Sequence, residues 1–356
     1  MGIPYKTQPP RAFWETAVSM LNPLELKNFY TKKFDISSSY IATAGSCFAQ
    51  HIGRNIKEKG FKFLDVEPAS KLFPEDLHTQ YSYGIYSARY GNIYTVRQLL
   101  QLFQRAFNEF SPVEKFWTKG DGFVDPYRPT IEPNPFISVE EVLEQQAEHL
   151  ENVKTMFATC GVFIFTMGLT ESWENALDGA VFPVVPGTRA GGEFDDKKYR
   201  FHNFAYPSII NDLELFWSKL QSVNSKCKMI LTVSPVPLVA TAMPQHVAVA
   251  TMYSKSVLRA VAGDFASLHD NVDYFPSFEI ISLPSTRGIY FMPDGRSISS
   301  FGVSQVMKSF FEVHTPSGSL VESNGNAVIT TSNDNNFADP LCDEEILKTL
   351  MEFNHE

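Results

Sequence analysis

Residues able to do chemistry gather in three short turns of this sequence. Each turn follows an apolar stretch that reads as a β-strand: residues 45–47 (GSC), 168–171 (GLTE) and 234–237 (SPVP). If these strands run parallel, their carboxyl ends meet at one edge of the sheet, where α/β proteins bind their ligands. The sequence therefore predicts that three segments far apart in the chain form one site.

Ser46 is the first candidate nucleophile. It follows the apolar residues 40–44 and opens a stretch with apolar residues at helical spacing, so it lies at a strand-to-helix turn. A helix N-terminus offers unpaired N–H groups and a partial positive charge, which favour a developing oxyanion. The alternative is that Ser46 only caps the helix, the commonest use of serine there. Cys47 is a rival nucleophile because the same helix end lowers the pKa of a thiol, unless it is an inert packing thiol.

A serine nucleophile needs a general base within hydrogen-bond reach. His246 lies downstream of the third polar turn and could return to the site; otherwise it opens a helix at the surface. His51 shares the helix of Ser46 but points away from it, and His202 lies in a loop. Glu171 could orient a histidine, could act as the base if burial raises its pKa, or could be only a carboxylate at a helix N-terminus.

The elements that position these turns alternate between strands and helices. Continuous apolar runs predict buried strands at residues 40–44, 161–166 and 228–234, with a short one near 278–282. Apolar residues at helical spacing predict helices at about 46–60, 95–109, 138–158, 207–223, 247–268 and 299–313. Residues 168–206 read as irregular. The alternation favours a parallel sheet covered by helices on both faces.

Length and composition narrow the class of protein. With 356 residues, 44% of them hydrophobic, the chain can bury a sizeable core in one elaborated α/β domain or in two domains. A net charge of −10 and the lack of a run of basic residues argue against nucleic acid as a partner. No apolar stretch approaches the roughly 18 residues of a membrane-spanning helix. The N-terminus also lacks the apolar core of a secretory signal, so we expect a cytoplasmic location.

The chain divides by composition into three parts. We interpret residues 1–35 as an N-terminal arm, residues 36–314 as the folded domain and residues 315–356 as a polar linker ending in a short helix. Cys160 and Cys227 flank apolar runs, as buried core thiols would. Because neither a metal-ligand pattern nor a nucleotide-binding motif stands out, we expect no metal and no cofactor.

A resemblance to a known family rests on several separated motifs. The GSCFA sequence at residues 45–49 is similar to the naming motif of the GSCFA family, which is placed among the SGNH (GDSL-like) esterases and lipases. The resemblance spans about residues 36–313 and continues in order through YGNIYT at 90–95, MGLTESW at 167–173, LTVSPVPL at 231–238 and YSKSVLRAVAG at 253–263. It implies a three-layer α/β/α sandwich with a parallel sheet, of the flavodoxin-like SGNH-hydrolase type.

The resemblance also implies roles for individual residues. By position, Ser46 matches the nucleophile of the first sequence block, and Gly91 with Asn92 resembles the second block. Gly168 begins the third block, where SGNH enzymes carry a Gly-x-Asn-Asp element. In those enzymes the nucleophile N–H, the glycine N–H and the asparagine side chain form the oxyanion hole. This sequence has Thr170 in place of that asparagine.

The larger departure from the SGNH pattern concerns the general base. SGNH enzymes place Asp-x-x-His just before the last helix, and the matching stretch here is residues 291–297. Asp294 fits the aspartate, but Ser297 stands where the histidine would be. A base must then come from another part of the chain, with His246 as the leading candidate.

The residues and the resemblance together favour a hydrolase of ester bonds. Ser46 would attack an acyl carbonyl, a base would take its proton, and water would release the acid. The expected substrate is a small-molecule or glycan acyl ester. One alternative is an O-acyltransferase that passes the acyl group to a sugar hydroxyl. The other alternative, motivated by Ser297, is a catalytically reduced binding protein on the same fold. The sequence makes no prediction of the oligomeric state.

Overall fold

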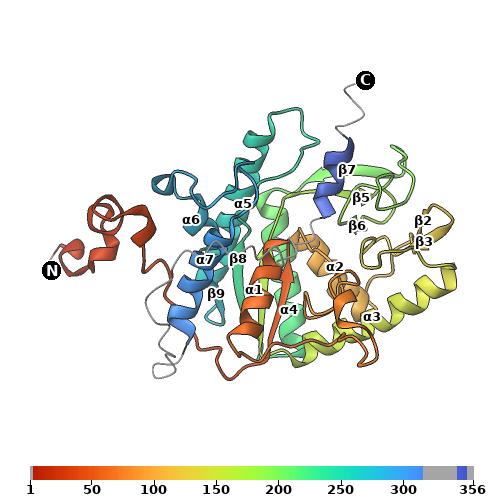
Figure 1. Cartoon of the computed structure of the whole chain (residues 1–356), viewed down its shortest axis with the longest axis horizontal. Coiled ribbons are helices and arrows are strands. Elements are labelled where there is room, and N and C mark those ends of the chain that lie inside the picture. Colours follow the sequence, from red (N-terminus) through yellow and green to blue (C-terminus); the bar gives the residue numbers. More distant parts are fainter. Residues whose placement is uncertain (1–2, 316–342, 351–356) are drawn as a thin grey trace.

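A four-stranded parallel sheet forms the centre of the computed structural model, which describes residues 3–315 and 343–350 (Figure 1). In spatial order the strands are β1 (Ile41–Gly45), β4 (Val162–Met167), β8 (Lys228–Val233) and β9 (Val272–Tyr274). Because all four run parallel, the turns after β1, β4 and β8 lie at one edge of the sheet. The N–H of Ser234 donates to the carbonyl of Met167 (2.9 Å), which joins two of these turns directly.

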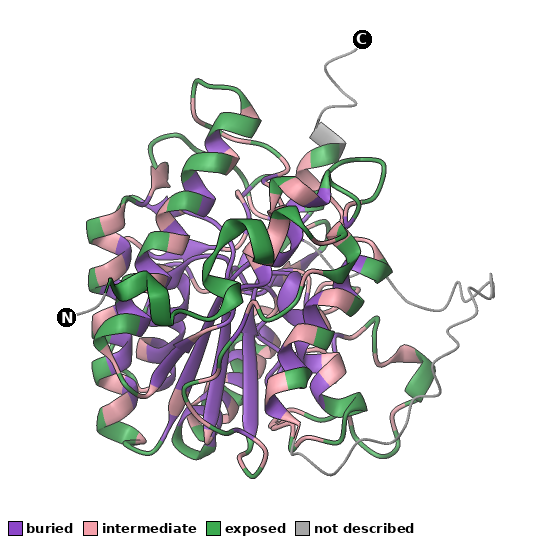
Figure 2. Ribbon diagram, turned by 90° about the vertical axis from the view of Figure 1, so that its left-hand side faces the viewer, coloured by how far each residue is buried: buried purple, intermediate pink, exposed green. Residues whose placement is uncertain are grey.

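Helices cover both faces of this sheet. One face packs against α2 (Val96–Ala106), α3 (Val139–Thr159), α4 (Tyr206–Val223) and α5 (Val247–Leu268). The other packs against α1 (Phe48–Glu58), α6 (Ser277–Ser282) and α7 (Ser300–His314). The strands between these layers are almost wholly buried (Figure 2). The predicted three-layer α/β/α sandwich is confirmed.

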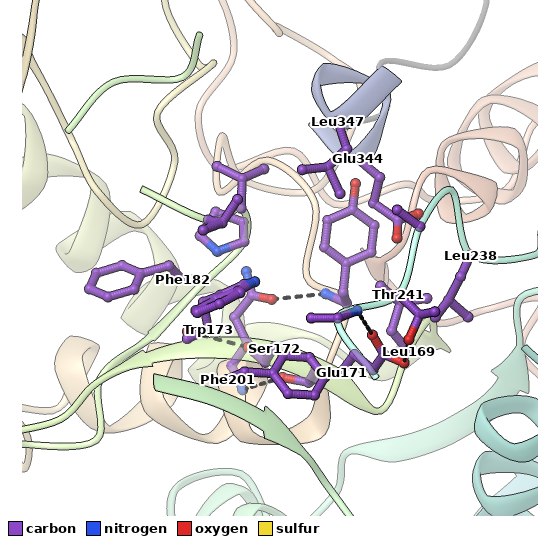
Figure 3. Close-up of a pocket in the computed structure, with 18 residues that line it drawn as sticks. Leu169, Glu171, Ser172, Trp173, Phe182, Phe201, Leu238, Thr241, Glu344 and Leu347 are labelled. Atoms are coloured by element: carbon purple, nitrogen blue, oxygen red, sulfur yellow. Dashed lines mark hydrogen bonds between the residues drawn. The ribbon is translucent and has the colours of Figure 1, made fainter. Parts of the chain in front are cut away.

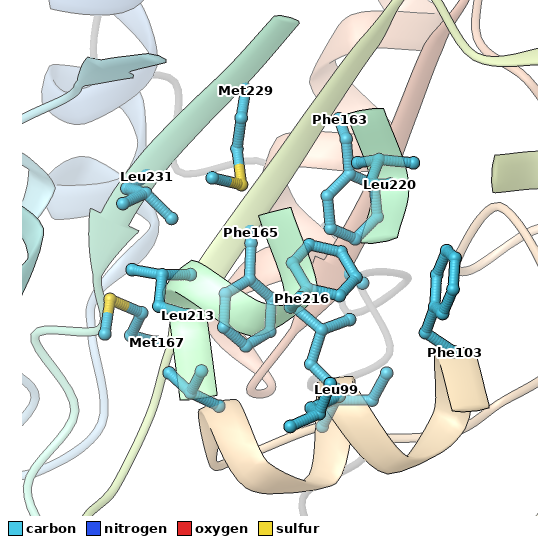
Figure 4. Packing of buried hydrophobic residues seen from close by; sticks show 14 of the residues in the cluster. Leu99, Phe103, Phe163, Phe165, Met167, Leu213, Phe216, Leu220, Met229 and Leu231 are labelled. Carbon is cyan, nitrogen blue, oxygen red and sulfur yellow. The ribbon is translucent and has the colours of Figure 1, made fainter. Parts of the chain in front are cut away.

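The side chains of β4 alternate between the two cores. Phe163 and Phe165 face the helices α2–α5, whereas Ile164 faces α1 and α7. Figure 4 shows Phe163 and Phe165 among the side chains of α2 and α4, where Phe216 contacts Phe103 edge-on at a centroid distance of 5.9 Å. A continuous apolar strand is therefore explained by burial on both faces, as parallel sheets require.

Local signals at the helix ends are confirmed. The Thr95 hydroxyl accepts the N–H of Gln98 (3.1 Å) at the start of α2, and Ser138 accepts the N–H of Glu141 (3.2 Å) at the start of α3. The expected buried thiols, Cys160 and Cys227, lie 3.6 Å apart (Sγ to Sγ) at the opposite edge of the sheet from the polar turns.

Two expectations about secondary structure are wrong. Residues 168–206 are not irregular: they form an antiparallel sheet of β5 (Glu171–Asn175), β6 (Val181–Phe182) and β7 (Tyr199–Asn203). Its strands are short and carry charged residues, so the sequence lacks the alternation that marks a strand. The run near 278–282 lies in helix α6, and the last strand is β9, because short apolar runs do not distinguish a strand from a buried helix. A small hairpin, β2 (Trp117–Lys119) and β3 (Gly122–Val124), was not predicted.

The two ends of the chain differ in how they meet this core. Residues 4–25 form short 3₁₀ and π turns, in agreement with the predicted irregular arm. Most of the predicted C-terminal linker, residues 316–342, lies outside the described residues. The predicted short helix is a 3₁₀ helix, η7 (Asp343–Leu350), which packs near β5 and β7 (Figure 1). Within the described part of the chain, no helix is long and apolar enough to cross a membrane.

A buried histidine at the end of α7 makes stability depend on pH. His314 is fully buried, with Nε2 3.2 Å from the Tyr30 hydroxyl, and burial lowers its pKa from 6.5 to about 4. Protonation therefore favours the unfolded chain, so this stability is complete above pH 6.5 and is lost as the pH falls toward 4. Between pH 7 and pH 4.5, we expect the free energy of unfolding to fall less in His314→Phe than in wild type. The difference should be on the order of 2 kcal/mol. Urea unfolding at pH 7 and 4.5 measures it, with exposed His246→Gln as the control; equal pH dependence in both variants would contradict the assignment.

Candidate active site

The turn after β1 places two candidate nucleophiles in different settings. The N–H of Ser46 donates to the carbonyl of Thr166 (3.1 Å), so Ser46 extends the β1–β4 ladder by one residue. Cys47 is the N-cap residue of α1. Gly45 has a φ of +140°, and a β-carbon there would lie 2.3 Å from the Thr166 carbonyl oxygen. Only glycine fits this close approach between the turn and the central strand.

Ser46 lies beside Gly168, as the sequence predicted. A β-carbon added to Gly168 would lie 3.1 Å from Cβ of Ser46 and 3.2 Å from the ring of Tyr94. Ser46 does not open into a water-accessible hollow, because its exposed fraction is 3%. Its hydroxyl has no hydrogen-bond partner among the described residues. The loop that follows β4 packs directly against it.

The segment 91–92 also reaches this turn. The N–H of Ile93 donates to the carbonyl of Gly45 (2.8 Å), and Gly91, with a φ of +69°, allows the chain to bend beside it. The hydroxyl of Tyr86 donates to Oδ1 of Asn92 and lies 3.5 Å from the carbonyl oxygen of Ser46. The oxygen of the Asn92 carboxamide is therefore engaged by Tyr86, and its NH₂ group donates to a different acceptor.

That acceptor is a carboxylate from the C-terminal helix. Nδ2 of Asn92 donates to Oδ2 of Asp343 (2.8 Å), and the hydroxyl of Thr130 donates to Oδ1 (2.5 Å). Burial raises the pKa of Asp343, while the hydrogen bonds from Thr130 and Asn92 oppose that rise. No local pattern places residue 343 here, since 251 positions separate it from Asn92.

A pocket of about 270 Å³ adjoins these residues (Figure 3). Its walls are mainly apolar and aromatic, and its few polar groups include Gln98, Glu171 and Thr241. Figure 3 shows Glu344 and Leu347 of the C-terminal helix on one side of the pocket, facing Trp173 and Phe201 of the small sheet. The antiparallel sheet that the sequence missed thus forms a pocket wall.

Glu171 occupies the first position of β5, not a helix N-terminus. Its carboxylate accepts a hydrogen bond from the hydroxyl of Thr241 (2.6 Å) and from the N–H of Ala242 (3.3 Å). Burial raises the pKa of Glu171, and these hydrogen bonds oppose the rise. A carboxyl group with a raised pKa in a pocket is suited to carry protons.

No imidazole of the described chain hydrogen-bonds to the Ser46 hydroxyl. His246 is exposed and uses Nδ1 to accept the N–H of Ala248 (3.1 Å), so it caps α5. Burial lowers the pKa of His51 to about 4 and keeps that ring neutral. His202 stacks on an aromatic ring of the next loop and lies near a carboxylate of β5. The predicted partnership between Ser46 and a histidine is therefore not formed.

Asp294 does not orient a base either. Its carboxylate accepts the N–H groups of Arg296 and Ser297 (2.9 Å each) and the hydroxyl of Ser297 (2.6 Å). These bonds, the Ser297 hydroxyl first, lower the pKa of Asp294 and close an exposed turn. The turn instead directs Arg296 inward, where Nε donates to the carbonyl of Pro237 (3.1 Å) and Nη2 pairs with Glu344 (3.2 Å).

The third predicted block is held by α5. The N–H of Thr170 donates to the hydroxyl of Ser254 (3.0 Å), so this residue serves to fix the loop. Nζ of Lys255 donates to the carbonyl of Gly168 (2.7 Å), and Lys255 is only 2% exposed. Sequence reasoning missed Lys255 as a site residue, because a lysine at helical spacing more often faces solvent. Among residues 3–315 and 343–350, no three His, Cys, Asp or Glu side chains gather as metal ligands.

A family model covers most of this arrangement. The model described as the GSCFA family matches residues 40–310. The chain belongs to the GSCFA family. In this GSCFA protein the match includes the turn at 45–47, the segment 91–92 and the loop at 168–171, but it ends before Asp343. The helix that supplies the bound carboxylate therefore lies outside the matched part. No curated protein shows significant similarity to the chain.

Proposed function

We propose that this GSCFA protein is an acyl-ester hydrolase whose nucleophile lies in the turn at 45–47. The observation that carries the proposal is the 2.8 Å hydrogen bond from Nδ2 of Asn92 to the carboxylate of Asp343. Donors of an oxyanion hole hold their oxygen at about 2.7–3.1 Å, and ester hydrolysis releases a carboxylate. The Asn92 amide binds a carboxylate beside a strand-to-helix turn. It is therefore suited to bind the oxyanion of the tetrahedral intermediate, which forms before the carboxylate product.

We favour Cys47 over Ser46 as the nucleophile, although both side chains are buried, with exposed fractions of 7% and 3%. The N–H of Ser46 is used in the sheet, and its buried hydroxyl lacks a base among the described residues. A hydroxyl in that position is a weak nucleophile at neutral pH. A thiol is intrinsically more nucleophilic than a hydroxyl, and Cys47 lies at the N-terminus of α1, where a helix favours negative charge. The acyl-enzyme on Ser46 is the competing form of the same proposal.

The proposed reaction combines the turn at 45–47 with Asn92 and with Glu171 of the pocket. The thiolate of Cys47 attacks the carbonyl carbon of the ester, and a C–S bond forms. The negative charge develops on the carbonyl oxygen, which accepts a hydrogen bond from Nδ2 of Asn92. Collapse of the adduct breaks the C–O bond, and the alcohol leaves with a proton from Glu171, whose pKa is raised by burial. Water then attacks the thioester and returns a proton to Glu171, so that the acid departs and the thiolate is restored. If a sugar hydroxyl replaces water in this step, the product is an O-acylated glycan.

A binding function is the second candidate. It is supported by Ser297, which stands where SGNH enzymes have a histidine, and by the Ser46 hydroxyl, which lacks a partner in the described chain. A protein of this kind would hold an acyl ester or an acid in the pocket without cleaving it.

Covalent labelling tests the proposal directly. The full-length chain carrying Asp343→Ala, which frees Nδ2 of Asn92, is treated with an acylating activity probe, alone and with Cys47→Ala or Ser46→Ala added, and the modified peptide is located by mass spectrometry. We expect labelling at Cys47, its loss in Cys47→Ala and its retention in Ser46→Ala. Labelling lost only in Ser46→Ala would assign the hydroxyl, and no labelling of either residue would favour the binding function.

A further inference from the structure

The C-terminal helix η7 meets the core through two acidic side chains as well as through the apolar Ile346 and Leu347. Asp343 is 6% exposed and Glu344 is 8% exposed, although short surface helices normally bury apolar residues. Burying a carboxylate is unfavourable unless hydrogen bonds or a cation compensate. The core must therefore provide that compensation at two adjacent places.

The first carboxylate meets a set of donors from separate segments. Asn92 provides its side-chain Nδ2 (2.8 Å) and its backbone N–H, and Thr130 provides its hydroxyl (2.5 Å). The hydroxyl of Tyr86 orients the carboxamide of Asn92 by donating a hydrogen bond to its Oδ1. The same hydroxyl accepts a hydrogen bond from Nε2 of Gln50 (3.1 Å). This orientation comes from the core and does not depend on the C-terminal helix.

The second carboxylate meets a guanidinium. Arg296 has a side chain only 13% exposed, and its Nη2 lies 3.2 Å from the carboxylate of Glu344. Nη1 of Arg296 lies 3.4 Å from Glu345, which is more exposed. The bond from Nε to the carbonyl of Pro237 fixes the guanidinium independently of the acidic segment. Arginine with a fixed fork is suited to carboxylate recognition.

The second carboxylate, Glu344, lies at the pocket. Glu344 and Leu347 belong to its lining, so a ligand that replaces the helix continues into the apolar space behind Leu169 and Trp173. We infer that the site of this GSCFA protein takes a ligand with two carboxylates, spaced as on consecutive acidic residues, and that residues 343–344 occupy it in cis. This inference deepens the proposed function and rests on the same site, but it concerns binding and not bond cleavage.

A peptide that copies the acidic segment tests the inference in the full chain. Fluorescently labelled acetyl-Asp-Glu-Glu-Ile-amide is titrated into wild type and into the double variant Asp343→Ala/Glu344→Ala, with anisotropy as the readout. We expect the double variant to bind at least about tenfold more tightly, because the competing segment no longer fills the site. Adding Arg296→Met to the double variant should weaken binding about tenfold or more, and the neutral peptide acetyl-Asn-Gln-Gln-Ile-amide should not bind.

Controls separate this inference from loss of fold and from the proposed chemistry. Circular dichroism confirms folding of each variant, and the exposed Glu312→Ala should leave peptide affinity unchanged from wild type. Cys47→Ala in the double variant should bind the peptide as the double variant does, so binding persists even if the hydrolase proposal fails. Equal binding of the acidic and neutral peptides, or no binding to the folded double variant, would overturn the inference.

Discussion

Replacing Cys47 by alanine is expected to lower kcat/KM for a p-nitrophenyl acyl ester at least about 1000-fold. The measurement uses the double variant Asp343→Ala/Glu344→Ala as background, so that the carboxylate of Asp343 no longer occupies the amide of Asn92. The size follows from loss of the covalent intermediate, because the remaining oxyanion donors give only residual catalysis. A 1000-fold loss corresponds to about 4 kcal/mol of transition-state stabilisation.

Two matched variants sharpen this result. Cys47→Ser should be nearly as inactive as Cys47→Ala, since a hydroxyl is a much weaker nucleophile than a thiol at neutral pH. Ser46→Ala should change kcat/KM less than about tenfold, because its side chain packs beneath the loop at Gly168. If Ser46→Ala abolishes turnover and Cys47→Ala retains it, the nucleophile is the hydroxyl.

Gly45→Ala is expected to destabilise the protein by about 3–5 kcal/mol. The residue has a φ of +140°, and its new β-carbon would lie 2.3 Å from the carbonyl oxygen of Thr166 on the central strand β4. Neither partner can move without breaking the β1–β4 ladder, so strain and steric overlap add. The same displacement would shift the turn that carries Cys47.

Gly60→Ala is the matched control for this effect. Gly60 also has a positive φ, +75°, but no atom lies within 4 Å of the position of an added β-carbon. Its cost should therefore be the conformational penalty alone, about 1–2 kcal/mol. Urea unfolding of both variants gives the difference, which isolates the steric overlap at residue 45. Equal destabilisation would show that the turn relaxes around the added methyl group.

Local rules explain what could be predicted about the fold. A continuous apolar run such as 162–167 can only be buried on both faces, so it predicts a central parallel strand. The hydroxyls of Thr95 and Ser138 satisfy the first N–H groups of their helices, which fixes where α2 and α3 begin. These signals act within a few residues and need no knowledge of distant parts of the chain.

The small sheet at 171–203 escaped prediction for the opposite reason. Its strands pair across loops, and residues such as Glu174 and Arg200 are stabilised by an ion pair between strands β5 and β7. The sequence therefore shows polar residues and glycines without the periodicity that local reasoning requires.

Strand direction alone brings the carboxyl ends of parallel strands together, so the turns at 45–47 and 168–171 could be assigned to one edge of the sheet from local patterns. Which groups face each other at that edge follows from the packing of distant segments. That packing buried the Ser46 hydroxyl, turned Arg296 inward in place of residue 297, and brought the carboxylate of Asp343 to Asn92. The physical reason is that hydrogen bonds and charge pairs depend on distances of about 3 Å between side chains, and no local pattern encodes such distances across the chain.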